Sequence, residues 1–167
     1  SIVVAEMICE LLDDISLLDK AKKQSDNAFY YPQRLPEDGF VDWSLPSNII
    51  ARHCRAMTKP YPGMRTIFKK ANTEIIMWEI VPFDNVTKGE IGQISNCFYT
   101  NEFLVNCSKG RVLVRDWEAS DDKWMPKRNM LLISKKFSEQ IEGIIKRHEL
   151  KHKKNQPISP RILNFCK

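Results

Sequence analysis

The 167-residue sequence has no apolar run close to the ~20 residues that a membrane-spanning helix needs, so no membrane partner is expected. Its first residues are apolar, but Glu6 and Glu10 interrupt them and no basic segment precedes them, which argues against a signal peptide. The five cysteines are odd in number and form no CxxC pair, which argues against a disulfide framework or a cysteine zinc site. These absences favour a cytoplasmic protein in a reducing compartment.

Most of the chain also lacks an excess of basic residues, although the formal net charge is +5. Residues 135–167 contain nine Lys and Arg against three Glu, a net charge of +6, which leaves −1 for residues 1–134. The basic character therefore belongs to the C-terminal segment. The length suits one domain of roughly 100–200 residues, and the 43% apolar content can supply a core.

Hydrophobic periodicity predicts a helix near each end of the chain. Apolar residues recur at three and four positions from Val4 to Leu18, and again within residues 134–150. Between them, residues 28–46 contain three prolines and should be irregular.

A third, short helix is expected from Ile49 to Met57. Ser44 or Ser47 would cap it, because a serine hydroxyl accepts from the free N–H groups of the first turn. The prolines within residues 59–63 would end it, since proline cannot continue a helix.

From residue 64 the apolar period changes to two, which is typical of half-buried strands. One helix before five short strands predicts an α+β, mainly β fold: a small OB-like β-barrel, closed or partly open, with a further helix at each end. The expected strands are 66–69, 74–81, 90–95, 102–107 and 111–117, the last two forming a hairpin.

Residues 36–65 carry a more specific signal, PEDGFVDWSLPSNIIARHCRAMTKPYPGMR. This segment resembles the start of the C-terminal domain of formyltransferases of the methionyl-tRNA formyltransferase type, which show D-G-x-I-D-W, then a helix ending I-R-A, then P-x-P-G-A. Gly89–Gly92 and Phe103–Gly110 resemble later motifs of that family, in the same order. Met64 replaces the usual Ala, and the chain after about residue 138 matches nothing in the family. The residues that match the first motifs are Asp38, Gly39, Asp42, Trp43, Ile49, Arg55, Ala56, Pro60, Pro62 and Gly63.

The resemblance implies a domain organisation. Residues 1–19 would be the last helix of a missing catalytic domain, 20–35 a linker, 36–135 the formyltransferase C-terminal OB-like domain, and 136–167 a helix and basic tail. The first residue is Ser rather than Met, which also suggests a piece of a longer protein.

The family's catalytic residues are an Asn, a His in an H-x-S-L-L-P loop and an Asp, and that loop is missing here. We therefore expect no catalytic residue and no cofactor in this chain, and no formyl transfer by it alone. The parent enzyme would use 10-formyltetrahydrofolate as its formyl donor.

The resemblance implies an accessory domain that positions the formyl acceptor, with its own N-terminal catalytic domain and initiator Met-tRNA as partners. Candidate nucleic-acid contacts are Arg52, Lys59, Lys69 and Lys70, because cations bind phosphates, although a solvated face is the alternative. Arg55 coincides with a motif position and is instead a candidate partner of Asp42 or Asp38.

Two other functions stay open at this point. The same domain type occurs in enzymes that formylate amino-sugar nucleotides, and a stand-alone nucleic-acid-binding module is the second alternative. The charge of −1 over residues 1–134 weakens the tRNA assignment, although local patches matter more than the sum.

His148 to His152 spell HExxH, a spacing that places two histidines on one helix face and can bind zinc. No Asp, Glu or His follows to supply a third ligand, and five basic residues crowd the motif, so we expect a solvated helix end and no metal. We expect His53 to pack at the core or its rim, and Trp43 and Trp78 to anchor the core.

Overall fold

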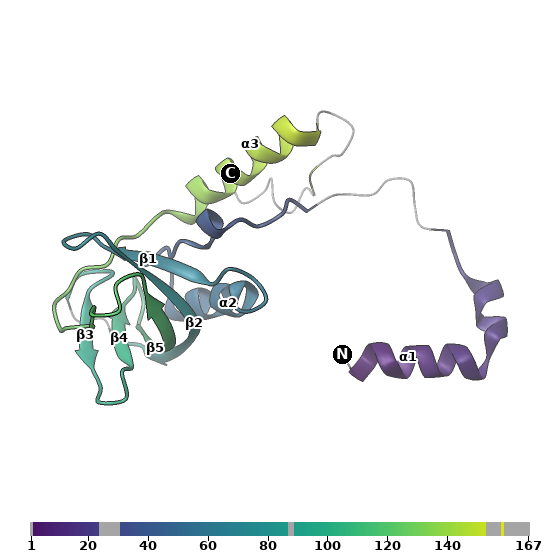
Figure 1. Ribbon diagram of the computed structural model, residues 1–167, viewed down its shortest axis with the longest axis horizontal. Helices are drawn as coiled ribbons and strands as arrows, with labels where there is room; N and C mark the ends of the chain where they lie inside the picture. Colours follow the sequence, from purple (N-terminus) through teal and green to yellow (C-terminus); the bar gives the residue numbers. More distant parts are fainter. Residues whose placement is uncertain (1, 24–30, 87–88, 153–157, 159–167) are drawn as a thin grey trace.

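The computed structural model describes residues 2–23, 31–86, 89–152 and 158 (Figure 1). Its centre is one five-stranded antiparallel sheet in the order β1-β2-β5-β4-β3. The strands are β1 (Met64–Phe68), β2 (Thr73–Asp84), β3 (Ile94–Cys97), β4 (Phe103–Asn106) and β5 (Arg111–Ala119). The helices are α1 (Ile2–Asp13), α2 (Ser47–Met57) and α3 (Phe137–His152), with 3-10 turns η1 (Ile15–Lys20) and η2 (Pro36–Gly39). All the expected strands are present, with shifted ends.

Alternation of side chains explains the sheet. Val112 and Val114 of β5 are fully buried, as the hairpin pattern predicts, while their neighbours are partly exposed. β4 does not alternate, because all four of its residues are buried. The mainly β, α+β class is therefore confirmed.

The two edge strands, β1 and β3, do not pair with each other. Residues 129–133 lie between them and make single bridges to each side, Leu132 to Phe68 and Leu131 to Gln93. The Ile133 N–H donates to the Ile67 carbonyl at 2.9 Å. This segment forms no strand ladder, so the sheet is not a barrel closed by its strands and the OB-like expectation is not confirmed.

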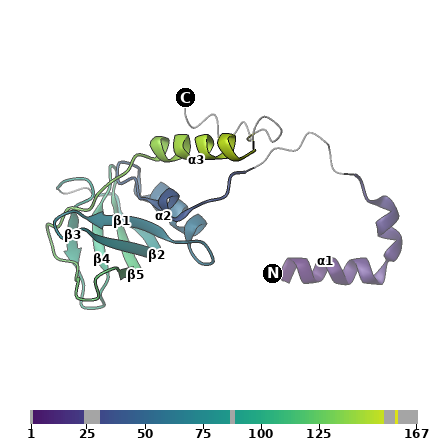
Figure 2. The same ribbon diagram turned by 45° about the horizontal axis from the view of Figure 1, so that its top comes forward.

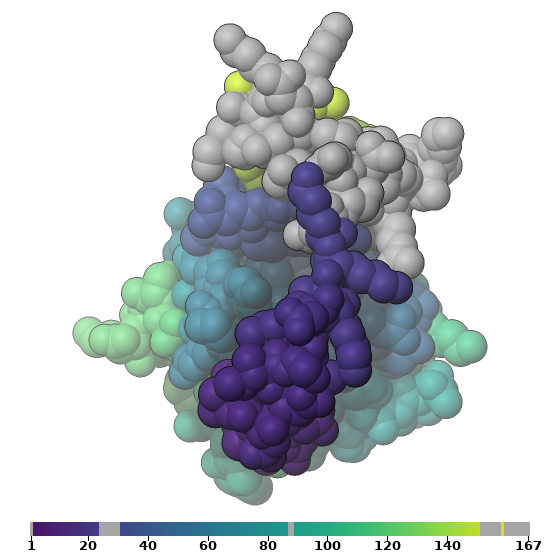
Figure 3. Space-filling view, turned by 90° about the vertical axis from the view of Figure 1, so that its right-hand side faces the viewer, coloured from purple at the N-terminus to yellow at the C-terminus, as the bar shows by residue number. Residues whose placement is uncertain are grey.

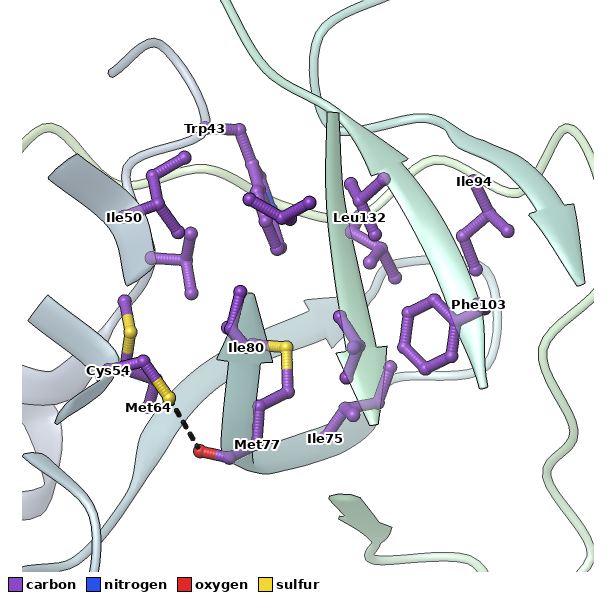
Figure 4. Close-up of a cluster of buried hydrophobic side chains, with 14 of the residues drawn as sticks. Trp43, Ile50, Cys54, Met64, Ile75, Met77, Ile80, Ile94, Phe103 and Leu132 are labelled. Atoms are coloured by element: carbon purple, nitrogen blue, oxygen red, sulfur yellow. Dashed lines mark hydrogen bonds between the residues drawn. The ribbon is translucent and has the colours of Figure 1, made fainter. Parts of the chain in front are cut away.

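Trp43 lies in the core and is 0% exposed, which confirms its expected role. Figure 4 shows it between Ile50 of α2 and Leu132. Trp78 was also expected to anchor the core, but this expectation is wrong. Trp78 is only partly buried, on the outer face of β2, where the Lys59 ammonium lies 4.9 Å from its ring centroid.

Two glycines allow the segments around them to touch. A Cβ on Gly39 would lie 2.5 Å from the Gly63 carbonyl oxygen, and Gly63 itself has φ +80°, with Ile76 and Trp78 against it. Side chains cannot fit at either position without displacing backbone or the β2 face. The resemblance singled out both glycines, and the close packing of η2 on the start of β1 gives the physical reason.

Two buried carboxylates attach α3 to the body. Asp38 pairs with Arg147 of α3 and accepts from the Leu35 N–H at 2.8 Å, while Asp42 accepts from the Phe137 N–H at 2.8 Å. Figures 1 and 2 show α3 beside η2. Arg55 was the expected partner of these acids, but it is exposed and Arg147 takes that place for Asp38.

The N-terminal cap of α2 also differs from expectation. The cap residue is Pro46, and Ser47 is the first residue of the helix, where its N–H donates to the Lys109 carbonyl at 3.1 Å. The Ser44 hydroxyl donates to Asp42 instead of capping the helix. Neither serine is therefore the cap.

The expected N-terminal helix is divided, because α1 ends at Asp13 and η1 begins at Ile15. Asp14 caps η1 by accepting from the Ser16 N–H at 3.1 Å. None of the residues of α1 is buried, and Figures 1 and 2 show the two elements apart from the sheet. In Figure 3, which looks from their side of the molecule, they lie in front of the body. No described helix is long and apolar enough to cross a membrane.

Candidate nucleic-acid interface

A groove of about 820 Å³ lies where the β1–β2 turn meets the segment after β5. The bridge between Phe68 and Leu132 fixes this arrangement, because it holds the end of β1 beside residues 127–134. We call it the basic groove. It is lined by Phe68, Lys69, Lys70, Ile91 and residues 127–134.

The charge of the basic groove is entirely positive. Lys69, Lys70, Lys127 and Arg128 line it, all four are exposed, and none has an ion-pair partner among the described residues. No Asp or Glu of the described ranges lines the groove. Four unneutralised cations around one depression are the electrostatic pattern that attracts a phosphate backbone.

The floor of the basic groove is apolar. Phe68 is buried beneath it, whereas Ile91 and Leu131 are 45% and 47% exposed. An apolar floor between cations can contact the sugar and base parts of a nucleic acid while the rim binds phosphates.

The structure divides the four residues that the sequence singled out. Lys69 and Lys70 lie together in the basic groove, whereas Arg52 and Lys59 are exposed on and after α2 and do not line it. Lys127 and Arg128 were missed. Their sequence signal is the basic pair after Pro126, which lies where no helix or strand was expected.

Exposed aromatic side chains gather at the tip of the β3–β4 hairpin. Tyr99 is fully exposed and Phe98 is 38% exposed. The hairpin tip is held by the Phe98 N–H, which donates to the Glu102 carbonyl at 2.8 Å. Unstacked bases can stack on aromatic rings presented in this way.

Two buried cysteines and His53 have environments that suit packing. Burial raises the pKa of Cys54 to about 11 and that of Cys107 to about 12, so neither thiol is a nucleophile near neutral pH. His53 stacks on Phe137 with ring centroids 4.5 Å apart, which confirms its packing role.

The HExxH motif has a different environment from the one expected. His148 is buried at 7% exposure, so the solvated helix end is wrong for this residue. The side chain of His152 lies outside the described residues. Within the described part of the chain, no three His, Cys, Asp or Glu side chains are grouped as metal ligands.

Comparison with known proteins places this chain in a formyltransferase domain family. The sequence profile of the formyl transferase, C-terminal domain family matches residues 35–134. The bifunctional polymyxin resistance protein ArnA of Wigglesworthia glossinidia brevipalpis is 30% identical over 112 residues, covering 66% of this chain and 16% of that protein. A methionyl-tRNA formyltransferase of Citrifermentans bemidjiense is 25% identical over 129 residues, covering 76% of this chain and 39% of that protein. The chain thus spans well under half of these relatives.

Solved structures show the same fold. HypX from Aquifex aeolicus, in a variant form, superposes with a TM-score of 0.55 at 16% identity, over 94% of this chain and 25% of HypX. HypX in complex with tetrahydrofolic acid gives a TM-score of 0.54 at 18% identity, over the same shares of the two chains. At such identities the likeness establishes the fold alone.

Proposed function

Because the chain belongs to the formyl transferase C-terminal domain family, we propose that it is the substrate-positioning domain of a methionyl-tRNA formyltransferase-like enzyme, and that its basic groove binds tRNA. The observation that carries the tRNA part is the set of four cations at Lys69, Lys70, Lys127 and Arg128, which have no ion-pair partner in the part of the chain that the structure describes. Two methionyl-tRNA formyltransferases among the relatives support the same substrate class.

Positioning explains how a domain without catalytic groups contributes to formyl transfer. The parent enzyme would take a formyl group from 10-formyltetrahydrofolate in a separate catalytic domain. Holding a large substrate at a fixed place lets its amino group meet the formyl donor more often than free diffusion allows. Charges on a rigid scaffold serve this purpose, and the β1–β2 turn and residues 127–134 are held to each other by the Phe68–Leu132 bridge.

We further propose that α1 packs on the enzyme's own N-terminal catalytic domain. The helix leaves Ile2, Met7, Ile8 and Leu12 more than half exposed, and it makes no contact with the sheet. An isolated 12-residue helix is marginal in water, so burial of an apolar face on a partner would stabilise it. The chain covers 39% and 40% of the methionyl-tRNA formyltransferases it matches, which leaves room for such a domain in the parent.

The test is the salt dependence of tRNA binding, measured by fluorescence anisotropy with the purified chain. Binding through the basic groove should weaken with salt, and log K should fall by about 0.9 per phosphate contact against log salt, by analogy with duplex DNA. The double variant Lys69→Glu/Lys70→Glu should weaken binding and lower this slope. Lys127→Glu/Arg128→Glu should do the same.

A matched control changes the net charge of the tail by the same amount as each double variant changes that of the groove. The variant Lys153→Gln/Lys154→Gln/Arg161→Gln/Lys167→Gln changes four residues outside the described part of the chain and should keep most of the affinity. A truncation after residue 138 is unsuitable, because it removes Gln140 and Arg147, which join α3 to the body. If the tail variant alone lost binding, the tail would be a non-specific polyanion anchor and the groove assignment would fail.

The second candidate is the same domain in a sugar-nucleotide N-formyltransferase. The match to ArnA, at 30% identity, is the observation that favours it. Absence of tRNA binding by the wild-type chain at low salt would select this candidate over the tRNA assignment.

A further inference from the structure

A second groove, of about 720 Å³, lies between η2, α2 and α3 and shares no lining residue with the basic groove. We call it the α2–α3 groove. Its volume falls in the range of roughly 300–1,000 Å³ that is typical of small-molecule sites. The residues that carry the argument are Arg34, Phe40, His53, Tyr61, Phe137 and Gln140.

Aromatic and proline rings form part of the walls of the α2–α3 groove. Phe40, Tyr61 and Phe137 line it together with the rings of Pro60 and Pro62. Tyr61 is 55% exposed, although its ring is a large apolar surface. Ring-lined walls of this kind favour a planar aromatic ligand, which buries both faces against them.

Gln140 lines the groove and has one buried side-chain acceptor, Oε1, that is left unused. The residue is 3% exposed, and its Nε2 donates to the carbonyl oxygens of Phe40 and Lys135, at 2.9 Å each. Two carbonyl acceptors fix the amide orientation, because only the NH₂ group can donate to both. Oε1 is therefore the free end, and it has no hydrogen-bond partner among the described residues. A buried acceptor in this state calls for a donor.

Arg34 adds an unused positive charge at the same groove. It is exposed and has no ion-pair partner in the described part of the chain. Arg34 lies near enough to His53 to contribute to the lowering of its pKa, second to burial. Asp38, the other charged residue in the lining, differs from Arg34, because its carboxylate already pairs with Arg147.

We propose that the α2–α3 groove binds a nucleoside 5′-phosphate, whose planar base carries an amino donor for Gln140 Oε1 and whose phosphate pairs with Arg34. The base lies between the rings of Phe40, Tyr61 and Phe137. The ligand is a free nucleotide or the nucleotide part of a larger metabolite, since both present the same base and phosphate. This site stands independently of tRNA binding in the basic groove.

The first experiment measures the binding of four small ligands to the full chain by isothermal titration calorimetry. Adenosine monophosphate is the main probe and should bind saturably. Adenosine lacks the phosphate, and purine riboside 5′-monophosphate lacks the 6-amino donor, so each should bind about tenfold more weakly for one lost hydrogen-bonded contact. Inorganic phosphate lacks the base and should bind more weakly than adenosine monophosphate.

Matched arginine variants show which of the two grooves binds the nucleotide. Arg34→Gln should weaken adenosine monophosphate binding about tenfold and remove the difference from adenosine, because the phosphate loses its partner. Arg128→Gln removes an equally exposed arginine from the basic groove and should leave nucleotide binding unchanged. Changing the ligand rather than Gln140 keeps the test valid, since a Gln140 variant would lose two buried hydrogen bonds and could unfold.

Two results would overturn the proposal. One is no saturable binding of adenosine monophosphate or cytidine monophosphate, both of which carry an amino group. The other is nucleotide binding that Arg128→Gln abolishes and Arg34→Gln preserves, which would assign the nucleotide to the basic groove. A nucleoside diphosphate sugar that binds more tightly than the nucleoside monophosphate, with the same loss of affinity in Arg34→Gln, would support the site. It would also show that the nucleotide is bound as part of the larger metabolite. The tRNA titrations above are separate measurements, so either proposal can fail while the other stands.

Discussion

The arginines on the sheet and the cations of the basic groove differ in how the fold treats them. Arg65 pairs with Glu74 at 2.8 Å, and Arg115 reaches both Glu79 and Glu102, at 3.0 and 3.1 Å. The basic groove has no such partners for its cations among the described residues, and no acid lines it. Basic residues in the described part of the chain thus fall into a paired class that belongs to the fold and an unpaired class, four members of which line the basic groove.

This difference shows why the summed charge of residues 1–134 misleads. Paired arginines neutralise acids locally, so they cancel in the sum and also in the field around the sheet. The groove cations cancel in the sum only against acids that lie elsewhere on the molecule. A surface ion pair contributes about 0–1 kcal/mol, so the fold gains little from either arrangement. Clustered, unpaired cations repel one another, which favours a role in binding an anion.

The largest expected effect is on the core that carries both classes of charge. Trp43→Ala should lower the free energy of unfolding by about 3–5 kcal/mol, because it empties a fully buried ring site between α2 and Leu132. Urea denaturation followed by circular dichroism measures this. Trp78→Ala is the control, since Trp78 is only partly buried and lies outside the core, and it should cost less. Equal losses in the two variants would contradict this account of the core.

A smaller loss is expected when a paired arginine loses its acid. Asp38→Ala should reduce the free energy of unfolding by about 1–3 kcal/mol, because the Leu35 N–H loses its acceptor and Arg147 loses its partner. Arg147 is 37% exposed, so water partly compensates its charge. Arg147→Gln should cost less than Asp38→Ala in the same denaturation experiment. The reverse order would mean that the contact holds α3 through Arg147 alone.

The sequence predicted those features that depend on local periodicity or on a motif. The five strands and α2 follow from alternating or helical spacing of apolar residues, whereas Trp43, Gly39 and Gly63 were found at motif positions. Lys69 and Lys70 could be singled out because they stand in a polar turn between two strands.

Other features depend on contacts between distant segments, which no local pattern encodes. Lys127 and Arg128 belong to the basic groove only because residues 129–133 bridge β1 and β3, and that segment has no periodic signal. Trp78 was misplaced because a tryptophan in a strand suits either face, and here Lys59 covers its outer one. Asp38 finds its partner 109 residues away on α3, whereas the motif position of Arg55 had made that residue the candidate.

Removing unpaired groove cations should leave stability almost unchanged. Lys70→Ala and Lys127→Ala should each shift the free energy of unfolding by no more than about 0.5 kcal/mol, because neither side chain has a partner to lose. Thermal denaturation at low and high salt measures this, and salt should raise the stability of the wild type slightly by screening the groove repulsion. A loss of several kcal/mol in either variant would show that these lysines are structural and would remove the distinction between the two classes.

His53 is a third kind of basic group, because burial and the charge of Arg34 lower its pKa from 6.5 despite the opposing charge of Asp42. The unfolded chain therefore binds a proton at a higher pH than the folded chain does. The contribution of neutral His53 to the stability of the fold is complete above about pH 6.5, and it is lost as the pH falls through the lowered pKa of His53 in the folded state. The stability of the wild type should thus be lower at about pH 5.5 than at about pH 7.5, by less than the other losses above.

His53→Gln separates this titration from others, because glutamine fills the site without gaining a proton. The difference in unfolding free energy between the two pH values should shrink in this variant. Glu102 does not interfere, because hydrogen bonds from Thr100 and Arg115 lower its pKa further below 4.5, so it stays ionised across the window. A pH difference that is equal in wild type and variant would mean that His53 titrates alike in the folded and unfolded chain. Its ring contact with Phe137, at 4.5 Å, would then be no barrier to protonation.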